Sequence, residues 1–196
     1  MLDPIEIDEN FEQLEFFIEQ DIRYYSKRRI FFERMHRLAM LFVLITSGSA
    51  SVALTGFFFS TEVSQLVAVL LTFFNGVIAA LDIVIGFSTK ARANESIYKQ
   101  LSRLLDSAQN IKNTERNEDL LIKIKNSYTE YTIENPPVYK ALRAMSYNEA
   151  IVSRAYDEDK FRKISFWKKI FSNVLPFSDS NFPLLQQSIT GNHIAN

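Results

Sequence analysis

Small and polar side chains follow one face of a long apolar stretch that begins at Gln65. They recur at intervals of three and four residues, which places them on one side of an α-helix. The series consists of Gln65, Ala68, Thr72, Asn75, Ala79, Asp82, Gly86 and Thr89. At a rise of about 1.5 Å per residue the stripe is about 36 Å long, enough to cross a hydrocarbon core of about 30 Å. The pattern predicts a membrane-spanning helix whose polar face meets another helix, another subunit or water.

A second apolar stretch precedes this one. Residues 38–61 contain no ionisable side chain, and in residues 63–89 Asp82 is the only one. Both stretches exceed the roughly 18 residues that mark a membrane-spanning helix. We predict spans over residues 38–60 and 64–88, joined by a short turn into a transmembrane hairpin at 38–89.

The basic residues set the orientation of this hairpin. They flank both spans on the side away from the turn and are missing from the turn itself. By the positive-inside rule, both termini lie in the cytoplasm of a multi-pass protein. The first 37 residues are too long and too acidic for a signal peptide, so we expect no cleavage. The absence of cysteine excludes disulfides and thiolate metal sites.

The remaining segments are also predicted to be helical, so the fold class is an all-α membrane protein. Residues 1–37 form a cytoplasmic amphipathic helix that no Pro or Gly separates from the first span. Residues 90–156 form a cytoplasmic helical bundle. Its first helix carries a heptad seam suited to holding subunits together: Ile97, Leu101, Leu104, Ala108 and Ile111. Residues 157–196 combine a basic amphipathic segment with a loosely ordered tail.

Two basic and aromatic segments suit a membrane interface. The first, at residues 23–37, includes Arg28 and Arg29, and its position beside a span favours lipid over nucleic acid as its partner. The second is a stripe of Ile164, Trp167, Ile170, Phe171 and Val174 opposite Lys163, Lys168 and Lys169. This segment either lies in the membrane interface or packs against the chain's own cytoplasmic helices.

Asp82 is the most costly residue to place in a membrane, at least about 2.5 kcal/mol near the bilayer centre. In an antiparallel hairpin its depth matches residues 39 and 40, so His36 or Arg37 lies within reach. We predict a structural ion pair between Arg37 and Asp82. Small residues suited to close helix packing lie on both spans: Gly48, Ser51, Thr55, Ala79 and Gly86.

Three interpretations of the stripe remain open. It packs as a seam on the first span, or stripes from several copies converge and line a hydrated pore, or a closed bundle exposes the stripe after a trigger. In a pore the polar lining consists of Gln65, Thr72, Asn75, Asp82 and Thr89, with Asp82 forming a carboxylate ring that favours cations.

The sequence offers little catalytic chemistry. It contains no glycine-rich nucleotide loop, and its only histidines are His36 and His193. We therefore expect no enzyme activity, no catalytic residues, no cofactor and no metal site.

The order of elements resembles the SLATT family (SMODS and SLOG-associating two-transmembrane effector domains) of bacteria. The resemblance covers about residues 20–156 and rests on six features: RRIFFERMHR at 28–37, GSAS at 48–51, ARANESIYKQL at 91–101, the helix with Tyr128 and Tyr131, the Pro136–Pro137 break and YNEA at 147–150.

This resemblance implies an oligomeric effector of the bacterial inner membrane that forms a pore or disrupts the membrane in antiviral defence by abortive infection. A separate sensor protein or nucleotide-signal enzyme would trigger it, and the family brings no catalytic residues. The alternative is a non-conducting membrane scaffold that docks a cytoplasmic partner through residues 90–156.

Overall fold

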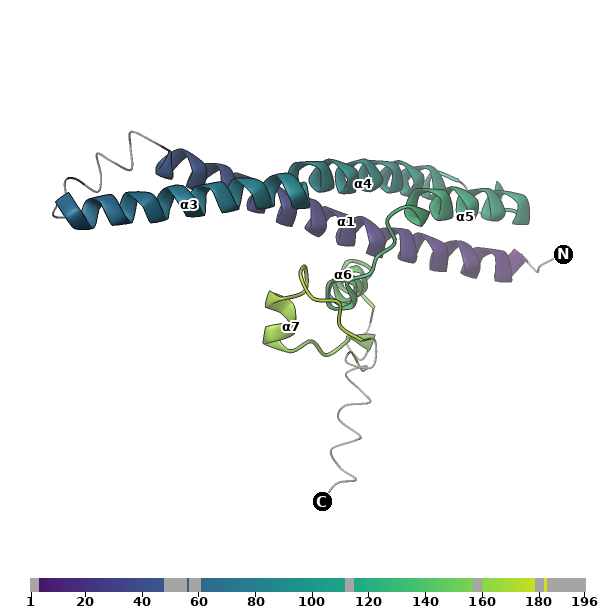
Figure 1. The fold of residues 1–196 in the computed structure, drawn as a ribbon. Coiled ribbons are helices and arrows are strands. Elements are labelled where there is room, and N and C mark those ends of the chain that lie inside the picture. The colour runs from purple at the N-terminus through teal and green to yellow at the C-terminus, as the bar shows by residue number, and fades with distance from the viewer. Residues whose placement is uncertain are drawn as a thin grey trace, which may run out of the picture. The chain divides into compact units, whose positions relative to one another are not determined.

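The computed structural model describes residues 4–47, 56, 61–111, 115–156, 160–178 and 182. Its helices are α1 (Pro4–Thr46), α3 (Thr61–Ile85), α4 (Phe87–Gln109), α5 (Glu118–Ile133), α6 (Lys140–Ser153) and α7 (Phe166–Ile170) (Figure 1). None of the described residues lies in a β-strand. The predicted all-helical class is therefore confirmed.

The chain divides into two compact units. One, the core unit, contains Met1–Arg28 and Asn94–Asn196; the other, the apolar-helix unit, contains Arg29–Ala93. Helix α1 runs for 43 residues without a break, as the missing Pro and Gly predict, and contributes to both units. Pro4 occupies its first turn, where the absence of an N–H has no cost.

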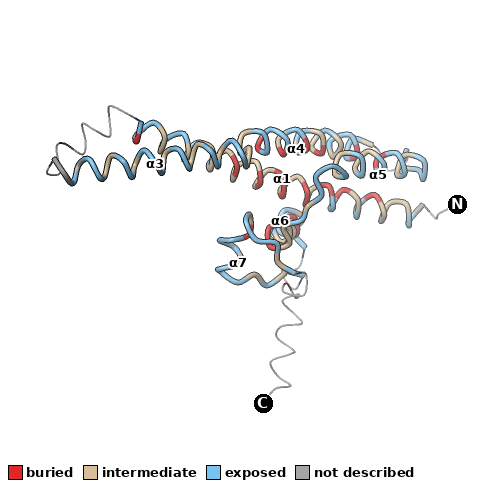
Figure 2. The backbone as a smooth tube through the Cα atoms, in the orientation of Figure 1, coloured by how far each residue is buried: buried red, intermediate tan, exposed pale blue. Residues whose placement is uncertain are grey.

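The core unit is built around one apolar stripe of α1. Phe11, Ile18 and Tyr25 on this stripe are fully buried. They belong to one cluster with Leu101 of α4, Ile124 of α5 and Leu142 of α6. Burying a side chain of this size contributes about 1.5–3 kcal/mol. Figure 2 shows the buried positions of α1 and α4 in red.

The residues of the predicted heptad seam of α4 lie in this core. Ile97, Leu101 and Ala108 are buried in it, and Leu104 and Ile111 pack against it. The periodicity correctly predicts a buried face, but the partners of that face are helices of the same chain. The expectation that the seam holds subunits together is therefore wrong, and any contact between subunits must use another surface.

Buried polar groups on α1 fasten it to later segments. Asp21 is 1% exposed, and the hydroxyl of Tyr128 donates a hydrogen bond of 2.6 Å to its Oδ2. Burial raises the pKa of Asp21, although the hydrogen bond from Tyr128 and the charge of Arg143 act in the opposite direction. Tyr25 donates its hydroxyl proton to the backbone carbonyl of Asn135. These hydrogen bonds join α1 to α5 and to Asn135, which lies two residues after the end of α5.

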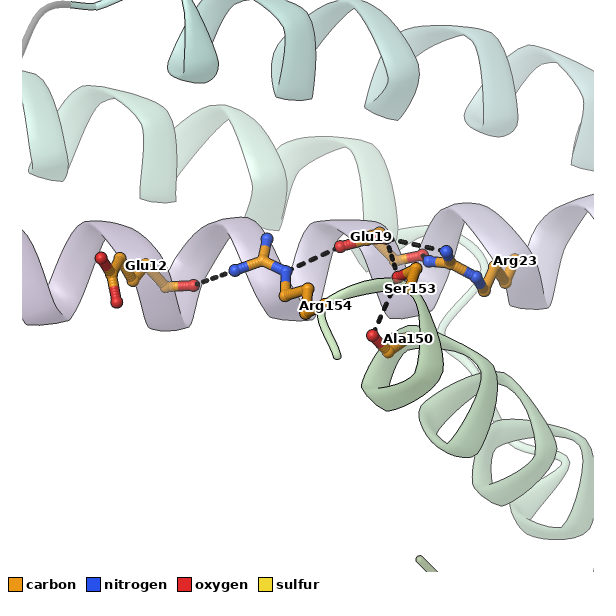
Figure 3. A network of polar contacts seen from close by, with 6 residues as sticks. All are labelled: Glu12, Glu19, Arg23, Ala150, Ser153 and Arg154. Atoms are coloured by element: carbon orange, nitrogen blue, oxygen red, sulfur yellow. Dashed lines mark hydrogen bonds and ion pairs between the residues drawn. The ribbon is translucent and has the colours of Figure 1, made fainter. Parts of the chain in front are cut away.

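Glu19 anchors the end of α6 to α1 (Figure 3). Its Oε2 accepts a hydrogen bond of 2.8 Å from Nε of Arg154, and its Oε1 accepts one of 2.7 Å from the hydroxyl of Ser153. Arg23 completes the network with an ion pair of 2.7 Å. Burial acts to raise the pKa of Glu19, but the hydrogen bonds from Arg154, Ser153 and Arg23 outweigh it, and the pKa is lowered.

We expect Glu19→Gln to lower the free energy of unfolding at pH 7 by about 1–2 kcal/mol, because it removes hydrogen bonds to a charged group. A lowered folded-state pKa means that this stabilisation is present above the unfolded value of about 4.5 and is lost as the pH falls through the folded value. Thermal unfolding of the full chain in detergent, followed by circular dichroism, should therefore show a smaller difference at pH 3 than at pH 7.

The matched control for this experiment is Glu130→Gln, which alters an exposed carboxylate on α5. It should leave the unfolding midpoint unchanged at both pH values. A loss for Glu19→Gln that is equally large at pH 3 and pH 7 would contradict the assigned role of the charge.

Candidate functional site

The stretch Gln65–Gln109, which includes most of α3 and all of α4, is the one part of the described chain that is long and apolar enough to span a membrane. None of its most apolar 18-residue window is buried inside the protein, whereas a core helix of a soluble protein is mostly buried. Phe73, Ile83 and Val84 on α3 are 65%, 81% and 82% exposed. Figure 2 shows α3 without any buried position. The helix therefore presents a large apolar surface that the described chain does not cover.

The first predicted span is described only in its first part. Residues 38–46 continue α1, and Leu38, Leu41 and Leu44 are more than half exposed. Residues 48–55 and 57–60 of the span, which include the predicted packing positions Gly48, Ser51 and Thr55, lie outside the described residues.

The polar stripe of α3 divides into two groups by exposure. Ala68, Asn75, Ala79 and Asp82 are half-buried. Gln65, Thr72 and Thr89 are exposed. Half-buried apolar residues, among them Val67, Leu71 and Ile78, lie between these positions, so the inner side of α3 is mixed and its exposed side is mainly apolar.

Asp82 meets His36 of α1. Nδ1 of His36 lies 3.1 and 3.2 Å from the two carboxylate oxygens of Asp82. Both distances are within hydrogen-bond range, and the tautomer of His36 determines which group donates. The pair lies within the apolar-helix unit and links α1 to α3.

The predicted ion pair of Arg37 with Asp82 is not the contact that forms. Arg37 is 78% exposed and pairs along its own helix with Glu33, at 3.4 Å. Successive residues of an α-helix are about 100° apart around its axis. The rotation of α1 that brings His36 to Asp82 therefore carries Arg37 away. The depth of Asp82 along the hairpin made His36 and Arg37 equal candidates for its partner. The rotation of α1 about its axis determines that the partner is His36.

Asn75 differs from the other polar residues of α3. Its Oδ1 is buried and has no hydrogen-bond partner within the described structure. Thr72, by contrast, donates its hydroxyl proton to the carbonyl of Ala68 at 2.8 Å. A buried acceptor without a partner costs about 1–3 kcal/mol. Asn75 is therefore a position near the middle of an apolar helix at which the described residues leave a polar atom unsatisfied.

Gly86 separates α3 from α4 and has a positive φ of 66°. This left-handed conformation favours glycine. A Cβ at this position would meet only Thr89, at the ordinary contact distance of 3.7 Å. Gly86 thus permits the backbone to change conformation between the helices, and the predicted role in close helix packing is wrong.

The predicted interface residues of α1 are engaged inside the protein. Arg28 is 8% exposed, its Nη1 donates to the carbonyl of Asn173 at 2.6 Å, and its guanidinium lies 4.0 Å from the centre of the Tyr139 ring. Nε of Arg29 lies 3.7 Å from Glu33. Arg28 is therefore a structural residue of the core unit, and the lipid-facing role predicted for it is wrong. Charge and aromatic content indicated a membrane interface here but did not identify these protein partners.

Helix α7 and the turn after it carry an apolar surface, which we call the α7 patch. Its residues are between 42% and 68% exposed: Phe166, Trp167, Ile170, Phe171, Val174 and Leu175. Ile164 alone of the predicted stripe packs inward, against a cluster that includes Phe182. Nζ of Lys168 lies 5.1 Å from the Phe182 ring, and Lys169 is exposed. The α7 patch is thus exposed and not packed against the described helices, and contact with lipid stays a prediction.

Comparisons of the chain with protein-family models, curated proteins and solved structures found no match. The resemblance to the SLATT family therefore remains a hypothesis that rests on the sequence.

A double-mutant cycle tests the contact between α1 and α3. We expect His36→Ala and Asp82→Asn to be coupled by about 0.5–2 kcal/mol in the stability of the detergent-solubilised chain, as contacting polar residues are. The matched cycle of Arg37→Ala with Asp82→Asn should be additive within about 0.5 kcal/mol. Coupling of Asp82 to Arg37 and not to His36 would contradict the contact in this structure and support the ion pair predicted from the sequence.

Trp167 is the only tryptophan of the chain and reports on the α7 patch. In the full chain reconstituted into bilayers, we expect its emission to be blue-shifted and quenched by brominated lipid, more strongly when anionic lipid is present. Lys163→Glu with Lys169→Glu should reduce this dependence on anionic lipid, and Lys123→Glu on α5 should not. Emission of a fully hydrated indole in both bilayers would show that the patch does not contact lipid.

Proposed function

We propose that this chain is an oligomeric effector of the bacterial inner membrane. A separate sensor triggers it, and it then permeabilises the membrane as part of an antiviral response. The observation that carries this proposal is the arrangement of α3, which has an uncovered apolar face and an unsatisfied polar group on its opposite face. The resemblance to the SLATT family supplies the biological setting.

The exposed apolar face of α3 is the reason for placing this helix in a membrane. Large side chains such as Phe73 and Ile83 are exposed over the length of the helix, and water is a poor solvent for so large a surface. Hydrocarbon removes this cost. The same solvent makes unsatisfied polar groups expensive, by several kcal/mol each. Asn75 therefore has to meet water or a polar group of another subunit.

Convergence of several copies satisfies both requirements. Small and polar side chains favour close approach and hydrogen bonds between membrane helices. In the triggered state α3 turns so that the Asn75 side of the stripe, half-buried in this structure, faces a common axis, where each Asn75 meets a neighbouring amide or an enclosed water. Thr72, exposed one turn away, adds a hydroxyl to the same lining. The polar residues then form a hydrated path of the kind that conducts ions.

This proposal changes the lining inferred from the sequence. Asp82 already has His36 as its partner, so its carboxylate is satisfied within one subunit. Thr72 and Asn75 become the principal lining residues, while Asp82 serves the hairpin. Contacts between subunits are assigned to the apolar helices, because the seam of α4 is occupied by the core unit.

A scaffold function is the second candidate. It is favoured by apolar side chains that the core unit leaves on its surface, including Ile133, Val138 and Val152, which are 69%, 53% and 63% exposed. A scaffold would bind its partner through such positions. It would leave the membrane potential intact.

Overexpression in bacteria with a potential-sensitive dye tests the proposed function. Wild type is expected to depolarise the cells, and Asn75→Leu and Thr72→Val to slow depolarisation by about tenfold or more, since each removes polar contacts worth about 1–3 kcal/mol. Phe73→Leu, on the exposed apolar face of the same helix, is the control and should behave as wild type. Equal amounts of each variant in the membrane fraction exclude an effect on expression.

The mass of the detergent-solubilised chain gives an independent test. A strict monomer or dimer would contradict the proposal, because one or two hairpins cannot enclose a hydrated path. Depolarisation by Asn75→Leu and Thr72→Val at the wild-type rate would contradict the assigned lining.

A further inference from the structure

The core unit contains a basic cavity of about 350 Å³ between α1, α6 and the segment at Arg162. Its wall is formed by Phe17, Gln20, Lys140, Arg143, Ala144, Tyr147 and Arg162. The size lies within the range of about 300–1,000 Å³ that is typical of small-molecule sites. The sequence pattern did not indicate this cavity, because the residues that form it are separated by more than a hundred positions.

The walls of the cavity are held in place by hydrogen bonds. The side chain of Asn148 donates to the carbonyl of Arg162 and accepts from its backbone N–H, both at 2.8 Å. The guanidinium of Arg162 lies 5.1 Å from the centre of the Tyr147 ring. Nε2 of Gln20 donates to the carbonyl of Arg143 at 3.3 Å. The segment that carries Arg162 is thus fixed to α6, and α6 is fixed to α1.

The cavity carries an excess of positive charge. Among the described residues, three cations and no carboxylate line it. Lys140 and Arg143 also lie in the first turns of α6, which has no acidic residue in its first turn and no side-chain cap from Tyr139. The helix dipole makes this end positive, which adds to the positive potential of the cavity.

Arg143 is ion-paired with Asp21 but does not form a hydrogen bond with it. Nε of Arg143 lies 3.9 Å from Oδ1 of Asp21, which is beyond hydrogen-bond distance. The adjacent hollow on the core unit is lined by Glu9 and Glu12 and has the opposite character. An anion therefore binds more favourably in the basic cavity than in the adjacent hollow lined by Glu9 and Glu12.

Two aromatic rings distinguish this cavity from a simple phosphate site. Phe17 and Tyr147 line the same wall as the cations, and Phe17 is 45% exposed. Aromatic rings beside cations bind nucleotides by stacking on the base while the cations hold the phosphate. A free phosphate or a lipid headgroup would use the cations and leave the rings uncovered.

We propose that this cavity binds a mononucleotide, with its phosphate at Lys140, Arg143 and Arg162 and its base against Phe17, because the guanidinium of Arg162 lies over the Tyr147 ring. Binding joins α1, α6 and the Arg162 segment, and it supplies a small-molecule input to the core unit. The role of this input as the trigger rests on the proposed function. The binding site itself does not.

Binding of AMP to the purified full chain in detergent, measured by calorimetry, tests the site. Arg162→Gln and Phe17→Ala are each expected to weaken binding by about tenfold or more, the loss typical of removing a hydrogen bond to a charged group or a stacking surface. Arg103→Gln, an exposed arginine of α4, is the matched control and should bind as wild type. Unchanged unfolding midpoints without AMP establish that the variants are folded.

Glycerol phosphate serves as a probe for a lipid headgroup, and inorganic phosphate as a probe for the anion alone. If either binds as tightly as AMP and Phe17→Ala has no effect, the nucleotide assignment is wrong. Absence of saturable AMP binding, or AMP binding that is insensitive to Arg162→Gln, overturns the site. Depolarisation by a chain that does not bind AMP would refute this inference alone, whereas AMP binding by a chain that never depolarises cells would refute the proposed function alone.

Discussion

The buried stripe of Phe11, Ile18 and Tyr25 on α1 is the contact on which the core unit depends. Helices α4, α5 and α6 each contribute to the cluster that this stripe enters, through Leu101, Ile124 and Leu142. The stripe exists because apolar residues recur at multiples of seven on an uninterrupted helix. A break in α1 would rotate one part of the stripe away from its partners. The absence of Pro and Gly from α1 after its first turn is thus a structural requirement.

Polar side chains on the same helix determine which segment packs at which position. Asp21 accepts a hydrogen bond from Tyr128 of α5, and Glu19 accepts hydrogen bonds from Ser153 and Arg154 at the end of α6. Arg28 donates a hydrogen bond to the carbonyl of Asn173. Each of these groups is largely buried, and leaving one unpaired costs more than its hydrogen bond contributes. Apolar contacts tolerate sliding of one helix along another, whereas these pairs do not. Specificity of packing therefore comes from the polar residues and most of the stabilisation from the apolar ones.

The pattern of the sequence predicts faces better than it predicts partners. The period of the α4 seam and the continuity of α1 follow from local rules, and the structure contains both. The covering of a face depends on residues far away in the chain, which is why the seam of α4 was assigned to another subunit and Arg28 to lipid. The choice of His36 over Arg37 depends on the rotation of a helix by one residue. The basic cavity has no local signal at all, since Arg143 and Arg162 come together with Phe17 only in the fold.

The two polar residues on the inner face of α3 have different consequences for assembly. Asp82 is satisfied by His36, so that a single subunit holds its most costly side chain without help. Asn75 is not satisfied within the described residues, and it lies about 10 Å further along the helix. A subunit in a bilayer would therefore be self-sufficient at Asp82 and incomplete at Asn75. An amide donates and accepts at once, so identical copies are able to satisfy one another, which like-charged carboxylates cannot do. In the proposed oligomer, the residue that favours association of copies is then Asn75, and the carboxylate at position 82 acts within each copy.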